Sequence, residues 1–359
     1  MRRYFEDIGA NSGRSAHKLA REASRLVFET REGIAKLLGV KDSSRIIFTL
    51  NATGGLNLAI LSSLKEGDRV ITTSMEHNSV MRPLRFLEKK RGIKVDVIKC
   101  SEAGVIEPDD IKKKITKNTR LVIATAASNV VGTIMPIRDI GKIAREHNIP
   151  FLVDAAQTAG SFPINTEESQ IDMLAFSGHK GLLGPQGTGC LYIKEGMKLT
   201  PLEFGGTGSR SEFEIQPDFL PDKYESGTPN LIGIAGLGAS VKFILNEGVE
   251  SIREKEQKLT KELLQKLKEI KKVIIYGTQD SQRQTSVVSI NIKNMESSEV
   301  GDILDRDYDI AVRCGLHCAP IAHKTIGTFP SGTVRISSGY FNTEADIDYL
   351  SRAIREIAK

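Results

Sequence analysis

Short apolar runs alternate with amphipathic stretches along the first two-thirds of the chain. Runs rich in β-branched residues, separated by stretches with helical spacing, predict strands connected by helices. We expect strands at 45–50, 69–74, 94–100, 120–126, 150–156, 173–178 and 189–194. We expect helices at 14–38, 54–65, 79–91, 107–116 and 138–148. This alternation predicts an α/β fold with a large, mostly parallel sheet that helices cover on both faces.

The pattern changes after residue 195. Residues 196–230 are rich in Gly, Pro and Ser and are too long for an ordinary connection, so we expect a functional or interface loop there. Beyond it we expect helices at 231–247, 249–270 and 343–357, and strands at 272–277, 286–292, 310–315 and 333–339. We therefore predict a large domain over 14–239 and a smaller α+β domain over 240–359 that includes part of 1–13.

Composition narrows the class of protein. The 359 residues are 40% hydrophobic and 26% charged, which is typical of a globular chain. The net charge is +5, and the densest basic runs, 89–94 and 111–117, fall at an expected helix end and surface loop. There a solvated face is favoured over contact with nucleic acid.

The sequence also bears on location. No uninterrupted apolar run approaches the roughly 18 residues that span a bilayer, so we expect no membrane segment. The N-terminal residues have no apolar signal core. Four cysteines do not make a disulfide framework, which favours reduced thiols and a cytoplasmic protein.

The glycine-rich patterns typical of nucleotide binding are not supported in this chain. GIAGLGAS (233–240) resembles a dinucleotide fingerprint, but it falls inside an expected helix instead of at a strand-to-helix turn. Close helix packing is the favoured interpretation. The chain has no GxxxxGK[ST] string, so a P-loop is not supported.

A lysine and an aspartate follow two of the expected strands. SGHK (177–180) places Lys180 at the carboxyl end of a strand, where open α/β sheets bind ligands. A partly enclosed lysine can lose its proton and form a Schiff base. Asp154 of VDAAQ (153–157) lies among apolar and small residues, where a carboxylate needs a cation such as the pyridinium of pyridoxal phosphate. The alternatives are an exposed loop lysine, and an aspartate that caps a helix or forms a buried ion pair.

Two further strand ends add candidate ligands. NATGGLN (51–57) joins a strand to a helix, and Thr53 with the free N–H groups of that helix could hold a phosphate. EHNSV (76–80) places His77 at the same edge, where an imidazole could stack on a pyridine ring. Taken singly, these are also a capped turn and a loop histidine.

The last cluster is AVRCGLHCAP (311–320). Cys314, His317, Cys318 and His323 have no second CxxC pair, so a structural zinc site is the weaker interpretation. A nucleophilic thiol beside His317 and Arg313 is favoured, because nearby positive charge lowers a thiol pKa.

In order along the chain, ATGGLN, EHNSV, SNVVGT, VDAAQ, SGHK, SGTPN, AVRCGLHCAP and GTVRIS resemble the class V, fold-type I pyridoxal-phosphate enzymes. More narrowly, they resemble group II (Suf-type) cysteine desulfurases. The resemblance covers nearly the whole chain. It implies pyridoxal 5′-phosphate as cofactor, a homodimer, and transfer of sulfur from L-cysteine to an enzyme cysteine, which leaves L-alanine. The persulfide would pass to a scaffold or acceptor protein for iron–sulfur cluster or thio-cofactor assembly.

The resemblance also assigns roles. Lys180 becomes the Schiff-base lysine, Asp154 the partner of the pyridine nitrogen, His77 the stacking ring and Cys318 the nucleophile that accepts sulfur. The remaining cofactor contacts that it implies are Thr53, Gly54, Gln157, Ser177 and His179, with Thr228 reaching the phosphate of the neighbouring subunit. Asn129, Arg313 and Arg335 would line the substrate pocket.

The chain departs from the family pattern in two places. The family usually has a YLDNAA-like strand before the region where this chain begins, so we expect one pocket wall to be missing or the start to be assigned late. The loop reads RCGLHCA where the family commonly has RTGHHCA. Cys314 could therefore provide a second sulfur relay or a disulfide with Cys318.

Alternative functions stay open from the sequence. A selenocysteine or cystine C–S lyase, or a class V aminotransferase, would use the same lysine and aspartate. A non-catalytic sulfur- or metal-binding relative is the third possibility.

Overall fold

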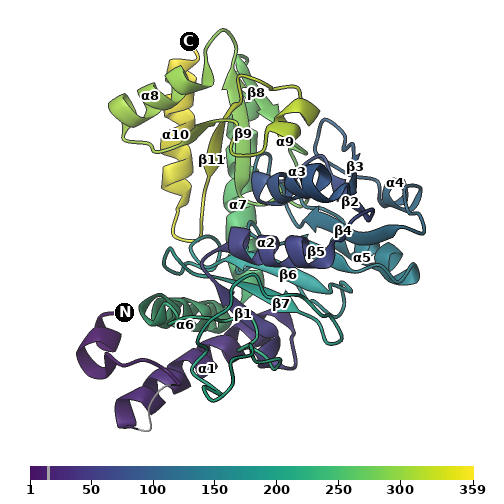
Figure 1. Ribbon diagram of the computed structural model, residues 1–359. Helices are drawn as coiled ribbons and strands as arrows, with labels where there is room; N and C mark the ends of the chain where they lie inside the picture. The colour runs from purple at the N-terminus through teal and green to yellow at the C-terminus, as the bar shows by residue number, and fades with distance from the viewer. Residues whose placement is uncertain (14–16) are drawn as a thin grey trace.

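The computed structural model describes residues 1–13 and 17–359, and Figure 1 shows a large sheet in the middle of the molecule with a smaller sheet above it. The large sheet contains β1 (Ile46–Thr49), β2 (Arg69–Thr73), β3 (Lys94–Ile98), β4 (Thr119–Thr125), β5 (Phe151–Asp154), β6 (Met173–Ser177) and β7 (Gly189–Ile193). Their order is β1-β7-β6-β5-β4-β2-β3, and β7 alone runs against the other six. The prediction of a mostly parallel sheet is confirmed.

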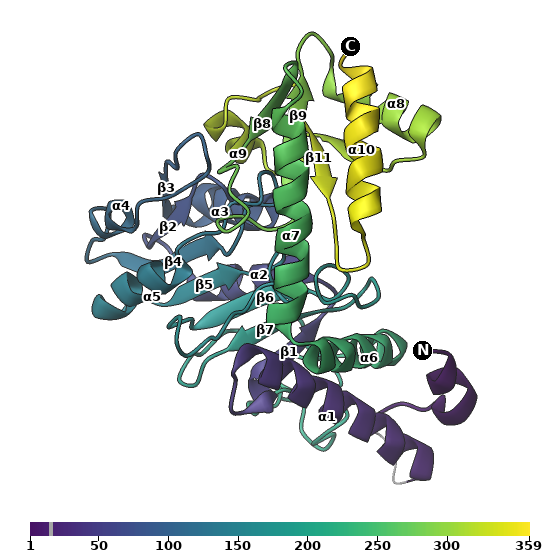
Figure 2. The ribbon, with the colours of Figure 1, turned by 180° about the vertical axis from the view of Figure 1, so that it is seen from behind.

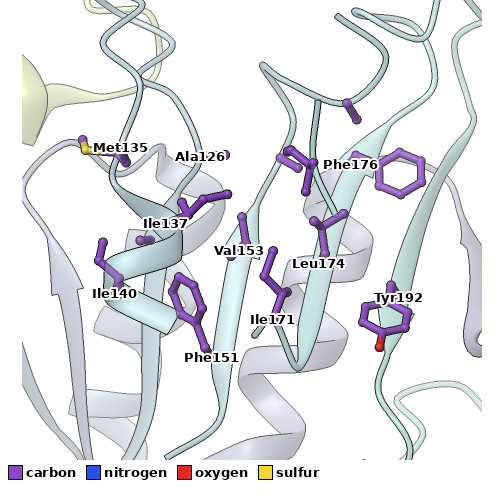
Figure 3. Packing of buried hydrophobic residues seen from close by; sticks show 14 of the residues in the cluster. Ala126, Met135, Ile137, Ile140, Phe151, Val153, Ile171, Leu174, Phe176 and Tyr192 are labelled. Atoms are coloured by element: carbon purple, nitrogen blue, oxygen red, sulfur yellow. The ribbon is translucent and has the colours of Figure 1, made fainter. Parts of the chain in front are cut away.

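Both faces of this sheet are buried, because alternate residues of each strand enter different cores. Phe151 and Val153 of β5 pack into one core, whereas Leu152 between them packs into the other. The first core also receives α1 (Lys18–Leu38), α5 (Ile137–Glu146) and α6 (Leu231–Glu247). The second receives α2 (Ala52–Ser63) and α3 (Asn78–Arg91). Figure 3 shows the first core, with Ile137 and Ile140 of α5 beside Phe151.

The smaller sheet is antiparallel, in the order β10-β11-β9-β8. Its strands are β8 (Val273–Tyr276), β9 (Val287–Ile292), β10 (Arg313–Gly315) and β11 (Thr333–Ser337). It packs against α7 (Val249–Lys268), α8 (Ser297–Tyr308) and α10 (Glu344–Ile357). The helix α8 was not expected from the sequence.

The long helix α7 connects the two parts of the molecule (Figure 2). Its residue Ile252 belongs to the first core of the large sheet, whereas Leu259 and Leu263 belong to the core of the small sheet. The predicted domain boundary at 239/240 lies inside α6, and it stays a prediction. Near the N-terminus, the π-helix η1 (Tyr4–Ile8) places Tyr4 against Ala23 of α1 and Leu231 of α6.

The remaining elements are short: η2 (Ser43–Arg45), α4 (Pro108–Lys112) and α9 (Pro320–Thr325). The start of the helix expected over 14–38 falls partly on residues 14–16, which lie outside the described residues. Among the described residues no single helix is long and apolar enough to cross a bilayer, although α6 and α7, bent at 82°, meet the length and composition requirement together. The segment 196–230 contains neither helix nor strand, as expected for a loop.

Candidate active site

Three predicted site residues lie where parallel strands of the large sheet end. His77 follows β2, Asp154 is the last residue of β5, and Lys180 follows β6. These strands run parallel, so their carboxyl ends meet at one edge of the sheet, which is where open α/β sheets bind ligands. A pocket of about 560 Å³ opens at this edge, and its lining includes Thr53, His77 and Cys318.

Asp154 is a buried carboxylate, 4% exposed. Its Oδ1 accepts a hydrogen bond from the Ala156 N–H at 2.9 Å. Burial raises the pKa of Asp154, and the positive charge of Lys180 opposes that rise. Within the part of the chain that the structure describes, no ion pair within 4.0 Å joins Asp154 to a cation. A carboxylate in this position is therefore ready for a cationic ligand atom.

Lys180 is partly buried beside this acid. Burial lowers the pKa of Lys180, and Arg335 and Arg313 lower it further, whereas Asp154 raises it. The amine consequently loses its proton more easily than an exposed lysine does, as a nucleophile or base must.

His77 forms the N-cap of α3, and its Nδ1 accepts a hydrogen bond from the Ser79 N–H at 3.0 Å. Burial, followed by the charges of Lys180 and Arg313, lowers the pKa of His77 to about 4. The ring is therefore neutral near pH 7. Ser79 Oγ lies 2.9 Å from His77 Nδ1 and 2.7 Å from Thr53 Oγ1, so it bridges two of the predicted residues.

The N-terminus of α2 forms the next wall of the site. Asn51 caps the helix through a 3.0 Å hydrogen bond from the Gly54 N–H, and Ser177 Oγ accepts the Ala52 N–H at 3.0 Å. Thr53, Gly54 and Ser177 thus gather at the N-terminus of α2, where the helix dipole suits a phosphate. Gly189 of β7 allows this strand to lie close to Asn51, because a Cβ at position 189 would lie 2.6 Å from Asn51 Cα.

The small sheet supplies two arginines. Arg313 of β10 lies directly opposite Arg335 in the register of the neighbouring antiparallel strand β11. Arg313 Nη2 donates to Cys318 Sγ at 3.3 Å, which places a cation beside the exposed thiol. Arg335 Nη1 donates to the Asn129 carbonyl at 3.0 Å, and its buried Nε has no partner among the described residues. The paired guanidinium groups are suited to a carboxylate.

The structure corrects the prediction for Cys314. Adjacent residues of a strand face opposite ways, so Cys314 points away from the Arg313 side chain that contacts Cys318. Its Sγ lies against Gly301 of α8, where an added Cβ would meet it. Burial raises the pKa of the Cys314 thiol. This packing argues against a sulfur relay or a disulfide with Cys318.

The structure also corrects the prediction for His317. Its ring does not provide positive charge to the thiol. Instead it is 2% exposed, and its Nε2 lies 3.0 Å from Thr333 Oγ1. Burial, together with the charge of Arg335, lowers the pKa of His317 to about 3, so the ring is neutral. Within residues 1–13 and 17–359, no group of three or more His, Cys, Asp or Glu side chains could hold a metal ion.

Some predicted residues are not tied to the rest of the site. Among the described residues, no hydrogen bond joins the side chain of Gln157, His179 or Thr228 to the other predicted groups. His179 and Thr228 are exposed. The Asn129 amide is already engaged, because its Nδ2 donates to the His317 carbonyl at 2.8 Å. The roles of these residues stay predictions.

Sequence reasoning missed Glu76, a fully buried acid at the end of β2. Its Oε1 accepts hydrogen bonds from Thr73 Oγ1 at 2.6 Å and from the Thr125 N–H at 3.0 Å. It thereby connects β2 to β4 beyond the last paired residues of those strands, Ile71 and Val122. Burial raises the pKa of Glu76 to about 8, and Asp154 adds to the rise. Its only signal in the sequence was a charge next to an apolar strand.

The donor set fits pyridoxal phosphate. Asp154 is a buried acid without a cation, His77 is a neutral ring at the same edge, and Lys180 is an amine with a lowered pKa. The helix terminus at Thr53 is suited to the phosphate. These are the four kinds of group that such a cofactor needs from a protein.

Comparison with known proteins agrees with this chemistry. The aminotransferase class-V family matches residues 1–350. A probable cysteine desulfurase of Methanothermobacter thermautotrophicus is 37% identical over 100% of this chain and 90% of its own length. One from Pyrococcus abyssi is 34% identical over the same shares.

Solved structures give the same result. The apo structure of the cysteine desulfurase from Thermococcus onnurineus NA1 superposes with a TM-score of 0.93 at 34% identity, covering 99% of this chain and 90% of that one. The cysteine desulfurase CsdA from Escherichia coli has a TM-score of 0.87 at 26% identity, covering 99% and 89%. This chain therefore belongs to the aminotransferase class-V family and, within it, to the cysteine desulfurases.

Proposed function

We propose that this chain is a pyridoxal-phosphate-dependent enzyme that transfers sulfur from L-cysteine to Cys318 and releases L-alanine. The observation that supports it best is an exposed thiol 3.3 Å from Arg313 Nη2, on a residue that lines the same pocket as Thr53 and His77. An aminotransferase has no need of a thiol at this place.

Asp154, His77 and Lys180 would hold the cofactor at the sheet edge, with its phosphate at the N-terminus of α2 near Thr53 and Ser177. When bound, pyridoxal phosphate withdraws electrons from the substrate Cα. Lys180 takes the Cα proton, and its lowered pKa favours the unprotonated amine that this requires. Arg335 and Arg313 orient the substrate carboxylate.

Cys318 completes the transfer. Its thiolate, stabilised by Arg313, attacks the substrate sulfur. A bond forms between the two sulfur atoms and the Cβ–S bond of the substrate breaks. The Cβ carbon gains a proton and is reduced to the methyl group of alanine, while the sulfur on Cys318 becomes a persulfide. No external oxidant or reductant is needed, and an acceptor protein then removes the outer sulfur.

A homodimer belongs to this proposal. The segment 196–230 exposes large apolar side chains, with Phe204 69%, Phe213 60% and Ile215 82% exposed. Apolar exposure of this extent favours an interface. Thr228 lies in the same segment, so a second copy seated there could receive it at its phosphate site.

The products test the function. Purified enzyme loaded with pyridoxal phosphate should convert L-cysteine to equal amounts of alanine and, with dithiothreitol, sulfide. Lys180→Ala should lose both products, whereas Cys318→Ser should keep the visible absorbance of bound cofactor but lose sulfide. A keto acid product would indicate an aminotransferase instead. A clear preference for selenocysteine or cystine would indicate a C–S lyase, and full sulfide release by Cys318→Ser would overturn the nucleophile.

A further inference from the structure

The Cys318 loop has an unusual backbone. His317 (φ 48°) and Cys318 (φ 58°) are consecutive non-glycine residues in the left-handed region. Each such residue costs about 1 kcal/mol or more relative to a right-handed conformation. Neighbouring groups must therefore hold the loop in this shape.

Backbone carbonyls of the loop are held from the large-sheet side. Asn129 Nδ2 donates to the His317 carbonyl, and the Asn78 N–H donates to the Cys318 carbonyl, both at 2.8 Å. Asn129 follows β4 and Asn78 begins α3, so two separate elements contribute. Neither bond reaches a side chain of the loop.

The His317 ring makes the connection on the small-sheet side. A hydrogen-bond chain runs from His317 Nε2 to Thr333 Oγ1 at 3.0 Å, to Ser289 Oγ at 3.1 Å, and on to the Val130 carbonyl at 2.5 Å. All four residues are buried. Water therefore cannot replace a lost member at little cost.

This chain determines the position of the imidazole proton. The Val130 carbonyl can only accept, so Ser289 must donate to it, and Thr333 must donate to Ser289. Thr333 has no second hydrogen, so His317 Nε2 must be the donor in the last bond. The neutral ring therefore carries its proton on Nε2. Its Nδ1 is left bare, and it is buried without a partner among the described residues.

The bonds close into a ring. Asn129 reaches the His317 backbone directly, and the adjacent Val130 is reached from the His317 ring through Thr333 and Ser289. The strained loop is thus fixed to the end of β4 and to both β9 and β11. A loss of the ring contact would free one side of the loop only.

We propose that His317 is a positioning residue, whose Nε2–H to Thr333 holds the loop so that Cys318 Sγ stays beside Arg313. This role rests on the proposed function, because it matters only if Cys318 is the nucleophile. The ring acts on Cys318 only through the backbone of the loop. It does not contact the substrate and does not contribute charge to the thiol.

The test measures the thiol itself. Holoenzyme without substrate is treated with iodoacetamide over a range of pH, and alkylation of Cys318 is followed by mass spectrometry. His317→Ala should change the rate of Cys318 alkylation at a given pH, because the released loop no longer keeps Sγ beside Arg313. It should also lower kcat about tenfold or more while KM for cysteine changes little. His317→Gln, which keeps a donor at the same distance along the side chain, should restore most of both.

Two further variants complete the design. Thr333→Val removes the acceptor without touching the loop and should reproduce His317→Ala, so it serves if His317→Ala fails to fold. His323→Ala is the matched control: its buried ring lies 5.3 Å from His317 but bonds to Thr328 outside the chain. If His317→Ala and Thr333→Val show the same alkylation profile as His323→Ala, the proposal is wrong. Alkylation does not need turnover, so a failure of the proposed function would be seen separately, as absence of alanine from the wild type.

Discussion

Glu76 is a single buried acid whose ionisation opposes folding. In the folded protein its pKa is raised from 4.5 to about 8, mainly by burial. The folded state therefore binds a proton that the unfolded state releases between those values, and stability falls as pH rises through this range. Below the lower value both states are protonated and the penalty disappears.

The variant Glu76→Gln tests this directly. Its amide oxygen can still accept from the Thr125 N–H, but it carries no charge. We expect the difference between its free energy of unfolding and that of the wild type, both measured with urea, to shift in favour of the variant as pH rises from about 5 to 8. A difference that stays constant with pH would contradict the raised pKa. Glu225→Gln, at a partly buried ion pair with Arg31, is a useful comparison because it should lose stability instead.

Cys314 gives a second prediction for a single residue. Because its Sγ faces Gly301 of α8, Cys314→Ala should leave persulfide formation unchanged. The measurement is the mass of the Cys318 peptide after a single turnover without a reductant. Loss of the added sulfur in Cys314→Ala would restore the relay interpretation.

Single residues also show how far the sequence could be read. Asp154 and Lys180 were predictable because each lies at or just beyond the carboxyl end of an apolar strand, and a strand end fixes where the next side chains lie. The direction of the His317 ring was not predictable from the sequence. It depends on a left-handed backbone and on Thr333 and Ser289, which come near the ring only after folding. Glu76 was missed for the same reason, since its backbone partner Thr125 is 49 residues away.

Among the elements, α2 would support the phosphate end of the proposed cofactor site through its cap. Asn51→Ala should cost about 1 kcal/mol and fray the first turn. We expect lower thermal stability and faster loss of pyridoxal phosphate on dialysis. Asn230→Ala is the matched control, because Asn230 caps α6 with the same 3.0 Å bond to Gly233 N–H. Equal retention of cofactor by the two variants would contradict a special role for α2.

The elements were predicted unevenly. Every strand expected from an apolar run is present, and most bounds differ by one or two residues, because buried parallel strands are apolar throughout. The strand expected at 310–315 is reduced to Arg313–Gly315. The helix α8 was missed because Ser297–Tyr308 is rich in acidic residues and buries only Ser297, Val300 and Leu304. Its contact with the small sheet, rather than its own pattern, keeps it helical.

For the whole molecule, the exposed apolar residues of 196–230 predict self-association. The wild type should sediment as a homodimer, and Ile215→Glu or Phe204→Glu should shift it toward monomer, because each buries a charge at the interface. Phe341→Glu changes a similarly exposed ring, 71% accessible, on the small-sheet part. This control variant should remain a dimer. Sedimentation as a monomer by the wild type would remove the dimer from the proposal.

The helix α7 has a consequence for how the pocket can change its width. Ile252 and Leu259 are seven residues apart, about 10 Å along the helix axis, yet they belong to different cores. A continuous helix packed into both cores resists bending. The large-sheet and small-sheet parts therefore cannot rotate freely relative to each other, since any rotation must bend α7 or move close-packed side chains past one another. The spacing between Lys180 on the large-sheet part and Cys318 beside the small sheet is thus set by a rigid frame.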